Sequence, residues 1–497
     1  MGRAIHMSDV SFSYASGAER IAHLSLEIHP GELLVITGVS GSGKSTVTRL
    51  INGLAPRFFG GELHGSLAIE GIAEGPSSFL ERTKCIGNVF QDPRSQFFSN
   101  EVAGEIAFGC ENYGRPHEEI VERVRLAAEE IGIAPLLNER VRTLSYGMRQ
   151  KVAIASAEAM EPEIYVMDEP SANLDVEATY QLSTIIGKLK DQGKTIVITE
   201  HRLYYLMDLA DRFVHLENGR LTREFTPREL RGLPAAKLRE LGLRTANLYD
   251  CEPALVKAAK PGDEMLRLAG IRKAFDSVPV LQDVSFSVGK GESVAIIGPN
   301  GAGKSTIGKI ASGLIKEDGG TVSLECVALK GKGHRGRVWY IPQDLDSWLF
   351  GEDLMDELLT GGKATADKRR EAEEILGRLG LRDVKDQHPA TLSGGQKQRL
   401  ALGVALAHHA STIILDEPTS GLDGRSMRMV SGVIRSLSES GIATLVISHD
   451  AECILSCCSR AIQIEDGRVV DDFKLKSTSK VLGAMGYSRL YPKEAGC

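Results

Sequence analysis

Two glycine-rich runs have the residue types and the spacing of a phosphate-binding loop. They are Gly38-Val-Ser-Gly-Ser-Gly-Lys44-Ser45-Thr46 and Gly298-Pro-Asn-Gly-Ala-Gly-Lys304-Ser305-Thr306. In such a loop the glycines let backbone N–H groups wrap a β-phosphate, and the following helix points its positive end at the anion. The lysine neutralises the β- and γ-phosphate oxygens, and the next hydroxyl suits a Mg²⁺ ion. Two sites for ATP with Mg²⁺ are therefore predicted, with ligands Gly38, Gly41, Gly43, Lys44, Ser45 and Thr46 in one and Gly298, Gly301, Gly303, Lys304, Ser305 and Thr306 in the other.

A pair of carboxylates closes an apolar run after each loop. Asp168-Glu169 and Asp416-Glu417 both precede a proline, and 248 positions separate the two aspartates. An aspartate at a strand end can hold Mg²⁺ directly or through water, and the next glutamate is suited to polarise an attacking water. Helix-capping acids would be the alternative, but Asp-Glu-Pro occurs in both copies. Asp168 and Asp416 are predicted metal ligands, and Glu169 and Glu417 are predicted catalytic residues.

The repeat divides the 497 residues into two similar halves, each large enough for a core of its own. We expect a first domain at 1–228, a polar connector at 229–263, a second domain at 264–471 and a tail at 472–497.

Composition narrows the classes of function. The net charge of −7 argues against a nucleic-acid partner, and no apolar run approaches the ~18 residues needed to span a bilayer. The N-terminus has no signal-peptide pattern. If the chain serves a membrane process, the membrane subunits are other chains.

The elements that must position these residues are short buried strands. In each half an apolar strand, 33–37 or 293–297, runs into the glycine-rich loop and a helix. Another strand ends at Asp168, and a third ends just before Glu200-His201. Buried strands that alternate with helices predict an α/β fold with a mainly parallel sheet covered on both faces.

With these motifs the chain resembles two fused subunits of the ATP-binding cassette (ABC) family. Leu392-Ser393-Gly394-Gly395-Gln396 is similar to the family signature before a helix, and residues 171–175 and 420–423 are similar to its D-loop. The resemblance implies two P-loop NTPase domains of ABC type, each with a helical signature subdomain, in a head-to-tail pseudo-dimer. It also implies switch histidines at His201 and His449, Q-loop glutamines on Mg²⁺ at Gln91 and Gln343, and adenine-stacking rings at Tyr14 and Phe275.

The first signature departs from the family pattern. It reads Leu144-Ser145-Tyr146-Gly147-Met148, so a tyrosine and a methionine stand where the family has glycine and glutamine. Ser145 and Gly147 remain as predicted nucleotide contacts. Tyr146 adds bulk where the backbone is expected to approach a nucleotide closely.

The resemblance also implies that each nucleotide is contacted by the signature of the opposite half. The intact signature, Ser393, Gly394, Gly395 and Gln396, would then serve the site of Lys44, Asp168, Glu169 and His201. The altered signature would serve the site of Lys304, Asp416, Glu417 and His449. Our hypothesis is that the first of these sites is the better hydrolytic site.

One branch of the family is indicated by the run Gln91-Asp92-Pro93-Arg94-Ser95-Gln96, which resembles energy-coupling-factor importers of vitamins or transition-metal ions. The second copy, after Gln343, lacks the proline and the second glutamine. The resemblance implies an integral membrane coupling subunit and a small membrane substrate-binding subunit as partners. It places the chain at the cytoplasmic face of the cell membrane as a peripheral subunit.

Other branches stay open as alternatives. Sugar-importer ATPases can be fused pairs of similar size, but the Gln-Asp-Pro run fits them less well. Ribosome-associated translation factors usually have a long charged linker, whereas this connector is short and mixed. DNA-repair relatives carry insertions between loop and signature that these halves are too short to hold.

Overall fold

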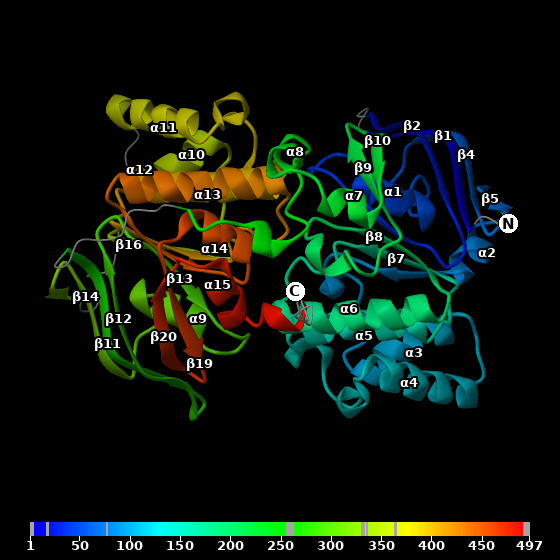
Figure 1. The fold of residues 1–497 in the computed structure, drawn as a ribbon, viewed down its shortest axis with the longest axis horizontal. Helices are drawn as coiled ribbons and strands as arrows, with labels where there is room; N and C mark the ends of the chain where they lie inside the picture. Colours follow the sequence, from blue (N-terminus) through cyan, green and yellow to red (C-terminus); the bar gives the residue numbers. More distant parts are fainter. Residues whose placement is uncertain are drawn as a thin grey trace. The chain divides into compact units, whose positions relative to one another are not determined.

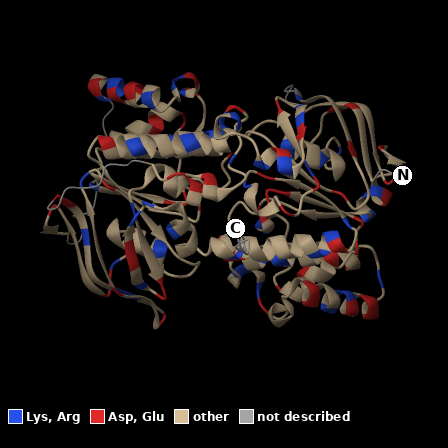
Figure 2. Cartoon of the chain, in the orientation of Figure 1, with Lys and Arg blue, Asp and Glu red and all other residues tan. Residues whose placement is uncertain are grey.

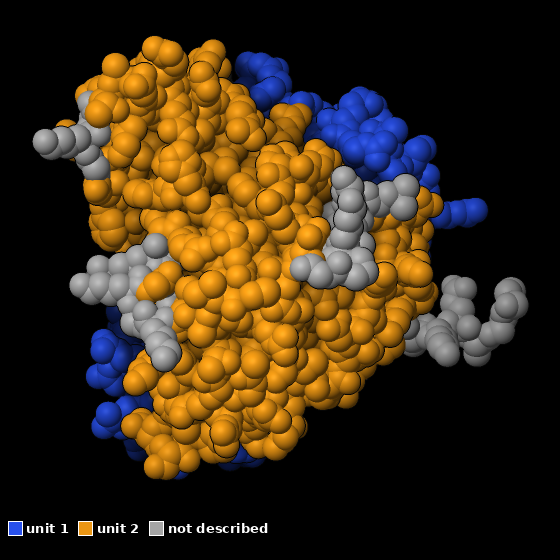
Figure 3. Space-filling model, turned by 90° about the vertical axis from the view of Figure 1, so that its left-hand side faces the viewer, with its two compact units in different colours: residues 1–246 blue, residues 247–497 orange. Residues whose placement is uncertain are grey.

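The computed structural model divides the chain into two compact units, residues 1–246 and 247–497 (Figure 3). The residues that the structure describes are 4–15, 19–75, 78–254, 263–329, 333, 336–361 and 365–490.

A six-stranded sheet forms the centre of the first unit, in the order β10-β9-β3-β8-β7-β6 (Figure 1). Its strands are β3 (Leu33–Thr37), β6 (Ile86–Val89), β7 (Ile164–Asp168), β8 (Thr195–Thr199), β9 (Arg212–Glu217) and β10 (Arg220–Phe225). All neighbours are parallel except β9 and β10. Since parallel strands end at one edge, the residues after β3, β6, β7 and β8 lie along that edge.

The first unit also has a four-stranded antiparallel sheet, in the order β2-β1-β4-β5. Its strands are β1 (Ile5–Ser13), β2 (Glu19–Ile28), β4 (Glu62–Ile69) and β5 (Ile72–Ala73). Apolar residues of this sheet, the central sheet and helix α1 (Lys44–Ile51) form one buried cluster. The helix that begins at Lys44 is thus packed between two sheets, which fixes the loop before it.

Helices of the first unit between β6 and β7 form a separate group. α3 (Val102–Asn112), α4 (His117–Ile131) and α5 (Tyr146–Glu158) pack on one another. This is the helical subdomain expected from the sequence, and α5 begins inside the first signature. Helix α6 (Val176–Asp191) follows the D-loop, and α2 (Phe79–Lys84) precedes β6.

The second unit repeats this plan with a six-stranded sheet, β16-β17-β18-β13-β19-β20, and a four-stranded sheet, β12-β11-β14-β15. The strands are β11 (Glu264–Phe275), β12 (Val278–Gly289), β13 (Ser293–Ile297), β14 (Gly319–Leu324), β15 (Val327–Ala328), β16 (Val338–Ile341), β17 (Thr412–Asp416), β18 (Ala443–Ile447), β19 (Arg460–Glu465) and β20 (Arg468–Lys474). The helices are α9 (Lys304–Ala311), α10 (Leu354–Leu359), α11 (Ala366–Arg378), α12 (Gly394–Ala407), α13 (Gly424–Glu439), α14 (Ala451–Cys457) and α15 (Thr478–Ala484). The predicted α/β fold, with two similar domains and a mainly parallel central sheet in each, is confirmed.

Charged side chains are concentrated on the outer helices. Acidic and basic residues are interspersed along α4 and α11, whereas the central strands carry few charged residues (Figure 2). The sheet strands β3, β8, β13, β17 and β18 are buried at every residue. Within the described part of the chain, no helix is both long and apolar enough to cross a bilayer.

The boundary between the units falls inside the expected connector. Helices α7 (Pro227–Arg231) and α8 (Ala235–Glu240) lie in the first unit, where the His215 ring is 3.1 Å from the carbonyl oxygen of Leu241. Residues from 247 onward lie in the second unit, where the Thr478 hydroxyl donates to the carbonyl oxygen of Cys251. The expected tail holds the end of β20 and helix α15.

Candidate nucleotide sites

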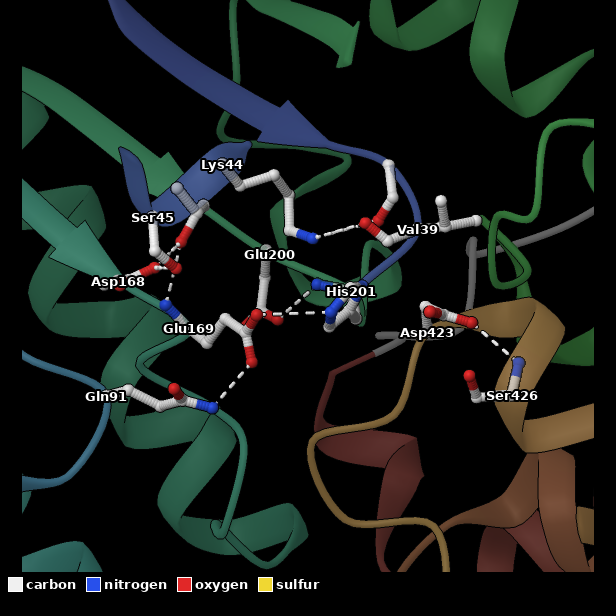
Figure 4. A network of polar contacts seen from close by, with 12 residues as sticks. Val39, Lys44, Ser45, Gln91, Asp168, Glu169, Glu200, His201, Asp423 and Ser426 are labelled. Atoms are coloured by element: carbon white, nitrogen blue, oxygen red, sulfur yellow. Dashed lines mark hydrogen bonds and ion pairs between the residues drawn. The ribbon is translucent and has the colours of Figure 1, made fainter. Parts of the chain in front are cut away.

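The glycine-rich loop of the first unit connects β3 to α1. Gly38 has a φ of 146°, and a Cβ there would overlap the carbonyl oxygen of Leu216, so glycine is required. The Lys44 ammonium donates to the carbonyl oxygens of Gly38 and Val39, each at 3.1 Å (Figure 4). The lysine is thereby held over the loop, where an incoming phosphate would meet it.

Asp168 lies at the end of β7, next to the start of α1. The Ser45 hydroxyl donates to Asp168 Oδ1 at 3.2 Å, and the Thr199 hydroxyl donates to the same oxygen at 2.5 Å. Burial, and then the charge of Glu169, raises the pKa of Asp168 above its usual range. A carboxylate and hydroxyls are hard oxygen ligands, so this donor set fits Mg²⁺.

Glu169 lies at the meeting point of three strand ends (Figure 4). The Gln91 amide donates to Glu169 Oε2 at 2.9 Å, and His201 Nε2 lies 3.2 Å from Glu169 Oε1. Glu169 has a φ of 46°, in the left-handed region that side chains rarely adopt, which is typical of functional positions. The structure thus brings together Lys44, Ser45, Gln91, Asp168, Glu169 and His201 from the predicted set.

A cavity of about 650 Å³ opens beside this cluster. Its wall includes Tyr14, the residue expected to stack on adenine, together with Arg49 and Phe59. The Arg49 guanidinium donates to the Tyr14 hydroxyl at 3.0 Å and lies 4.2 Å from the centre of the Phe59 ring. The other lining residues are Ala15, Arg20, Ser40, Gly41, Gly43, Lys44, Ser45, Thr46 and Glu169.

The second unit has the same plan with different partners. The Lys304 ammonium donates to the carbonyl oxygens of Gly298 and Pro299 at 2.8 Å, and Ser305 follows it in α9. Asp416, at the end of β17, accepts from the Tyr340 hydroxyl at 2.5 Å.

Glu417 also has a positive φ, 51°. It accepts hydrogen bonds from the Ser448 hydroxyl at 3.2 Å and from the His449 main-chain N–H at 3.3 Å. The His449 ring lies 3.6 Å from Glu417 and 3.0 Å from the Asn300 side-chain oxygen. Gln343 follows β16, and Phe275 ends β11 with 43% of its surface exposed.

The two signatures cap helices in different ways. Ser393 caps α12 in a capping box, in which the Gln396 side chain accepts from the Ser393 N–H at 2.8 Å. Ser145 caps α5 through the N–H of Met148, and methionine offers no oxygen in return.

The second glycine of each signature has a packing role. A Cβ at Gly147 would come within 2.9 Å of the Ala178 Cβ, and one at Gly395 within 2.7 Å of the Ser426 Cβ. Glycine at these positions therefore lets the signature helix approach the helix that follows the D-loop. Gly394, just before Gly395, is the first residue of α12.

The sequence did not predict the buried contacts of Glu200. Its carboxylate accepts from Ser171, from the Tyr205 hydroxyl at 2.8 Å and from the main-chain N–H of His201 at 2.6 Å. In the second unit Asp450 accepts from Thr419 instead, at 2.7 Å. Thr199, Arg49 and Phe59 were also missed. Only the position of Thr199 at the end of an apolar strand could have indicated its role.

Comparison with known proteins gives consistent matches. A family model described as "ABC transporter" matches residues 21–172 and 281–420. A "Putative ABC transporter ATP-binding protein" of Treponema denticola is 38% identical over 96% of this chain and 98% of its own length. The "Putative HMP/thiamine import ATP-binding protein YkoD" of Bacillus subtilis is 30% identical over 93% of this chain and 89% of its own length. The solved structure named "RNase-L Inhibitor" is 23% identical over 96% of this chain and 93% of its own length, with a TM-score of 0.65.

Proposed function

The chain belongs to the ABC transporter family, whose ATP-binding subunits hydrolyse ATP, and we propose that it drives an importer of the energy-coupling-factor type. In this proposal it binds at the cytoplasmic face of the cell membrane. An integral membrane coupling subunit and a small membrane substrate-binding subunit are its partners. The single observation that carries the ATPase assignment is the Lys44, Ser45, Asp168 and Glu169 cluster beside the cavity of the first unit.

Hydrolysis in the first unit would use residues whose positions are already set. Lys44 exchanges its loop carbonyls for phosphate oxygens, and the loop N–H groups bind the β-phosphate. Ser45, Asp168 and Gln91 would hold Mg²⁺, which neutralises phosphate charge when bound. Glu169 polarises the attacking water, while His201 orients the carboxylate. No covalent intermediate is needed, because positioning and charge neutralisation are sufficient.

We propose that the first unit contributes the better hydrolytic site. Gln91 and His201 approach the two carboxylate oxygens of Glu169 separately, so the carboxylate is oriented from both sides. The hypothesis that the signature around Ser393 completes this site, and the altered signature around Ser145 the other, stays a prediction from the family resemblance.

The structure of the region after each Q-loop supports the proposal that a membrane subunit binds there. The Glu105 carboxylate accepts from the N–H groups of Phe98 and Ser99, at 2.8 and 2.7 Å. Glu357 holds the N–H groups of Phe350 and Gly351 in the same way. These turns present Phe98 and Phe350 to solvent, 73% and 80% exposed, so each unit carries an apolar contact point beside its Q-loop.

The Gln-Asp-Pro run supports the energy-coupling-factor branch. Asp92 caps the turn Pro93–Ser95, and the Gln96 side chain returns to β6 through the N–H of Phe90 and the carbonyl oxygen of Asn88. The relative from Bacillus subtilis, whose name refers to HMP/thiamine import, supports vitamin uptake as the kind of transport. The likeness to RNase-L Inhibitor concerns the fold alone at 23% identity.

The proposal is tested by recovering partners from the host's own membranes in mild detergent, followed by mass spectrometry. We expect a polytopic membrane protein and a small membrane binding protein to accompany the tagged wild-type chain. A Phe98→Ser, Phe350→Ser double variant should lose both. A Leu80→Ser variant, which changes another exposed apolar residue, should retain them. Recovery of ribosomal proteins with no integral membrane protein would contradict the importer assignment.

A further inference from the structure

Tyr146, the unexpected residue of the first signature, makes a specific contact inside its own unit. Its hydroxyl donates to the main-chain carbonyl oxygen of Gln91 at 2.6 Å, and the side chain of Asn173 hydrogen-bonds the same phenol. Burial raises the pKa of Tyr146, so the hydroxyl keeps its proton. One side chain therefore connects the signature helix α5 with the Q-loop and the D-loop.

The second unit makes a corresponding connection by other means. The Lys397 ammonium of α12 lies 2.5 Å from a carboxylate oxygen of Asp346, three residues after Gln343. Only 15% of the Lys397 side chain is exposed, so solvent screens the attraction between the two charges less at the lysine than it would at a fully exposed ion pair. A signature helix is thus tied to its Q-loop in both units.

That ion pair cannot form in the first unit. The residues at the positions of Lys397 and Asp346 are Arg149 and Arg94, which are both cations. Arg149 donates instead to the carbonyl oxygens of Val141 and Arg142, and Arg94 pairs with Asp92 at 3.0 Å. Tyr146 thus makes, by a hydrogen bond, the connection that the second unit makes by a charge pair.

We propose that Tyr146 is a positioning residue for ATP hydrolysis in the first unit, acting through the Q-loop. With the Gln91 main chain fixed, the Gln91 amide remains directed at Glu169 Oε2, 2.9 Å away. The inference rests on the proposed role of Glu169 and deepens it. It also explains why a bulky residue stands at a signature position where the second unit has Gly394.

The variant Tyr146→Phe distinguishes the contribution of the hydroxyl from that of the ring, because it removes the hydroxyl and keeps the bulk of the side chain. Measured in a Glu417→Gln background, so that the first unit dominates turnover, this variant should lower kcat about three- to tenfold, the range expected for one hydrogen bond. The KM for ATP should change little, because Lys44 and the loop are untouched. Tyr180→Phe, on the exposed side of α6, is the matched control and should leave both constants unchanged.

If Tyr146 merely fills space in the signature, Tyr146→Phe will behave as the background does, and the proposal is wrong. Hydrogen exchange without nucleotide gives a second readout that does not depend on catalysis. Tyr146→Phe should accelerate exchange of the amides at 90–96, whereas Lys397→Met should accelerate exchange at 343–349 and leave 90–96 unchanged. Unchanged exchange at 90–96 in Tyr146→Phe would refute the connection even if ATP hydrolysis is confirmed. Full ATPase activity in Glu169→Gln would instead refute the proposed role of Glu169, on which this inference rests.

Discussion

At the scale of single residues, burial of the Asp168 carboxylate in the first unit lowers the stability of the folded state. Asp168 is surrounded by the Ser45 and Thr199 hydroxyls and by the neighbouring carboxylate of Glu169. Hydrogen bonds from two hydroxyls offset only part of the lost hydration of an anion. The hydration that is not replaced disfavours the charged form and raises the pKa of Asp168. A bound cation would stabilise the charged carboxylate and so oppose this effect.

The change Asp168→Asn is expected to stabilise the chain in the absence of Mg²⁺ and nucleotide. A carboxyl whose pKa is raised on folding binds its proton more tightly in the folded state, so folded stability decreases as pH rises through that window. The variant lacks this dependence, and its Tm should exceed that of the wild type by roughly a few degrees at pH 8 and by less at pH 5. Mg²⁺-dependent ATPase activity should be lost.

Thermal unfolding with a chelator present at both pH values measures this effect, with the exposed Asp191→Asn as control. A lower Tm for Asp168→Asn at pH 8 would show that the charge of Asp168 stabilises the empty site, contrary to this account.

At the scale of elements, the loop between α1 and β4 distinguishes the first nucleotide cavity. It spans residues 52–61, whereas the corresponding loop of the second unit spans 312–318. Gly61, with a φ of 143°, lets the loop pass against β1, since a Cβ there would overlap the main chain of Ser13 and the ring of Phe12. This close approach places Phe59 at the cavity beside Arg49.

Removal of this ring is expected to weaken nucleotide binding at the first site. Stacking of a base on an aromatic ring contributes about 1–3 kcal/mol, so Phe59→Ala should raise the Kd for ATP roughly tenfold. Binding is measured by calorimetry in a Lys304→Ala background, in which the second site is disabled. Phe58→Ala, which removes a ring 79% exposed, is the control and should bind normally. Equal Kd values for Phe59→Ala and Phe58→Ala would exclude a nucleobase contact.

The central strands could be predicted from the sequence, but the pairing of strands in the antiparallel sheets could not. Three of the central strands, β3, β7 and β8, are short apolar runs that end next to predicted site residues. A short stretch of sequence is therefore enough to predict them. In β1 four residues are buried and Asp9 is exposed, and the register with β4 is irregular, with Asp9 at a φ of 50° and Gly65 at 89°. Alternation along such a strand is broken, so its pairing depends on contacts between distant residues.

At the scale of the whole molecule, duplication supplies two similar units in which equivalent positions have diverged. The motif residues were predictable because their types and order repeat. Their partners were not: Tyr146 with Gln91, Lys397 with Asp346 and Glu200 with Ser171 join segments far apart in the sequence. Tyr146 was expected to be an obstacle to nucleotide binding, and the structure shows in addition a hydrogen bond to the Q-loop.

The central claim, that the chain hydrolyses ATP chiefly with the carboxylate of the first unit, is tested most directly by steady-state ATP hydrolysis of Glu169→Gln and Glu417→Gln. We expect Glu169→Gln to lose on the order of a hundredfold or more in kcat, the usual effect of removing a water-polarising group. Glu417→Gln should retain most of the activity. Equal losses in the two variants, or a larger loss in Glu417→Gln, would contradict the account.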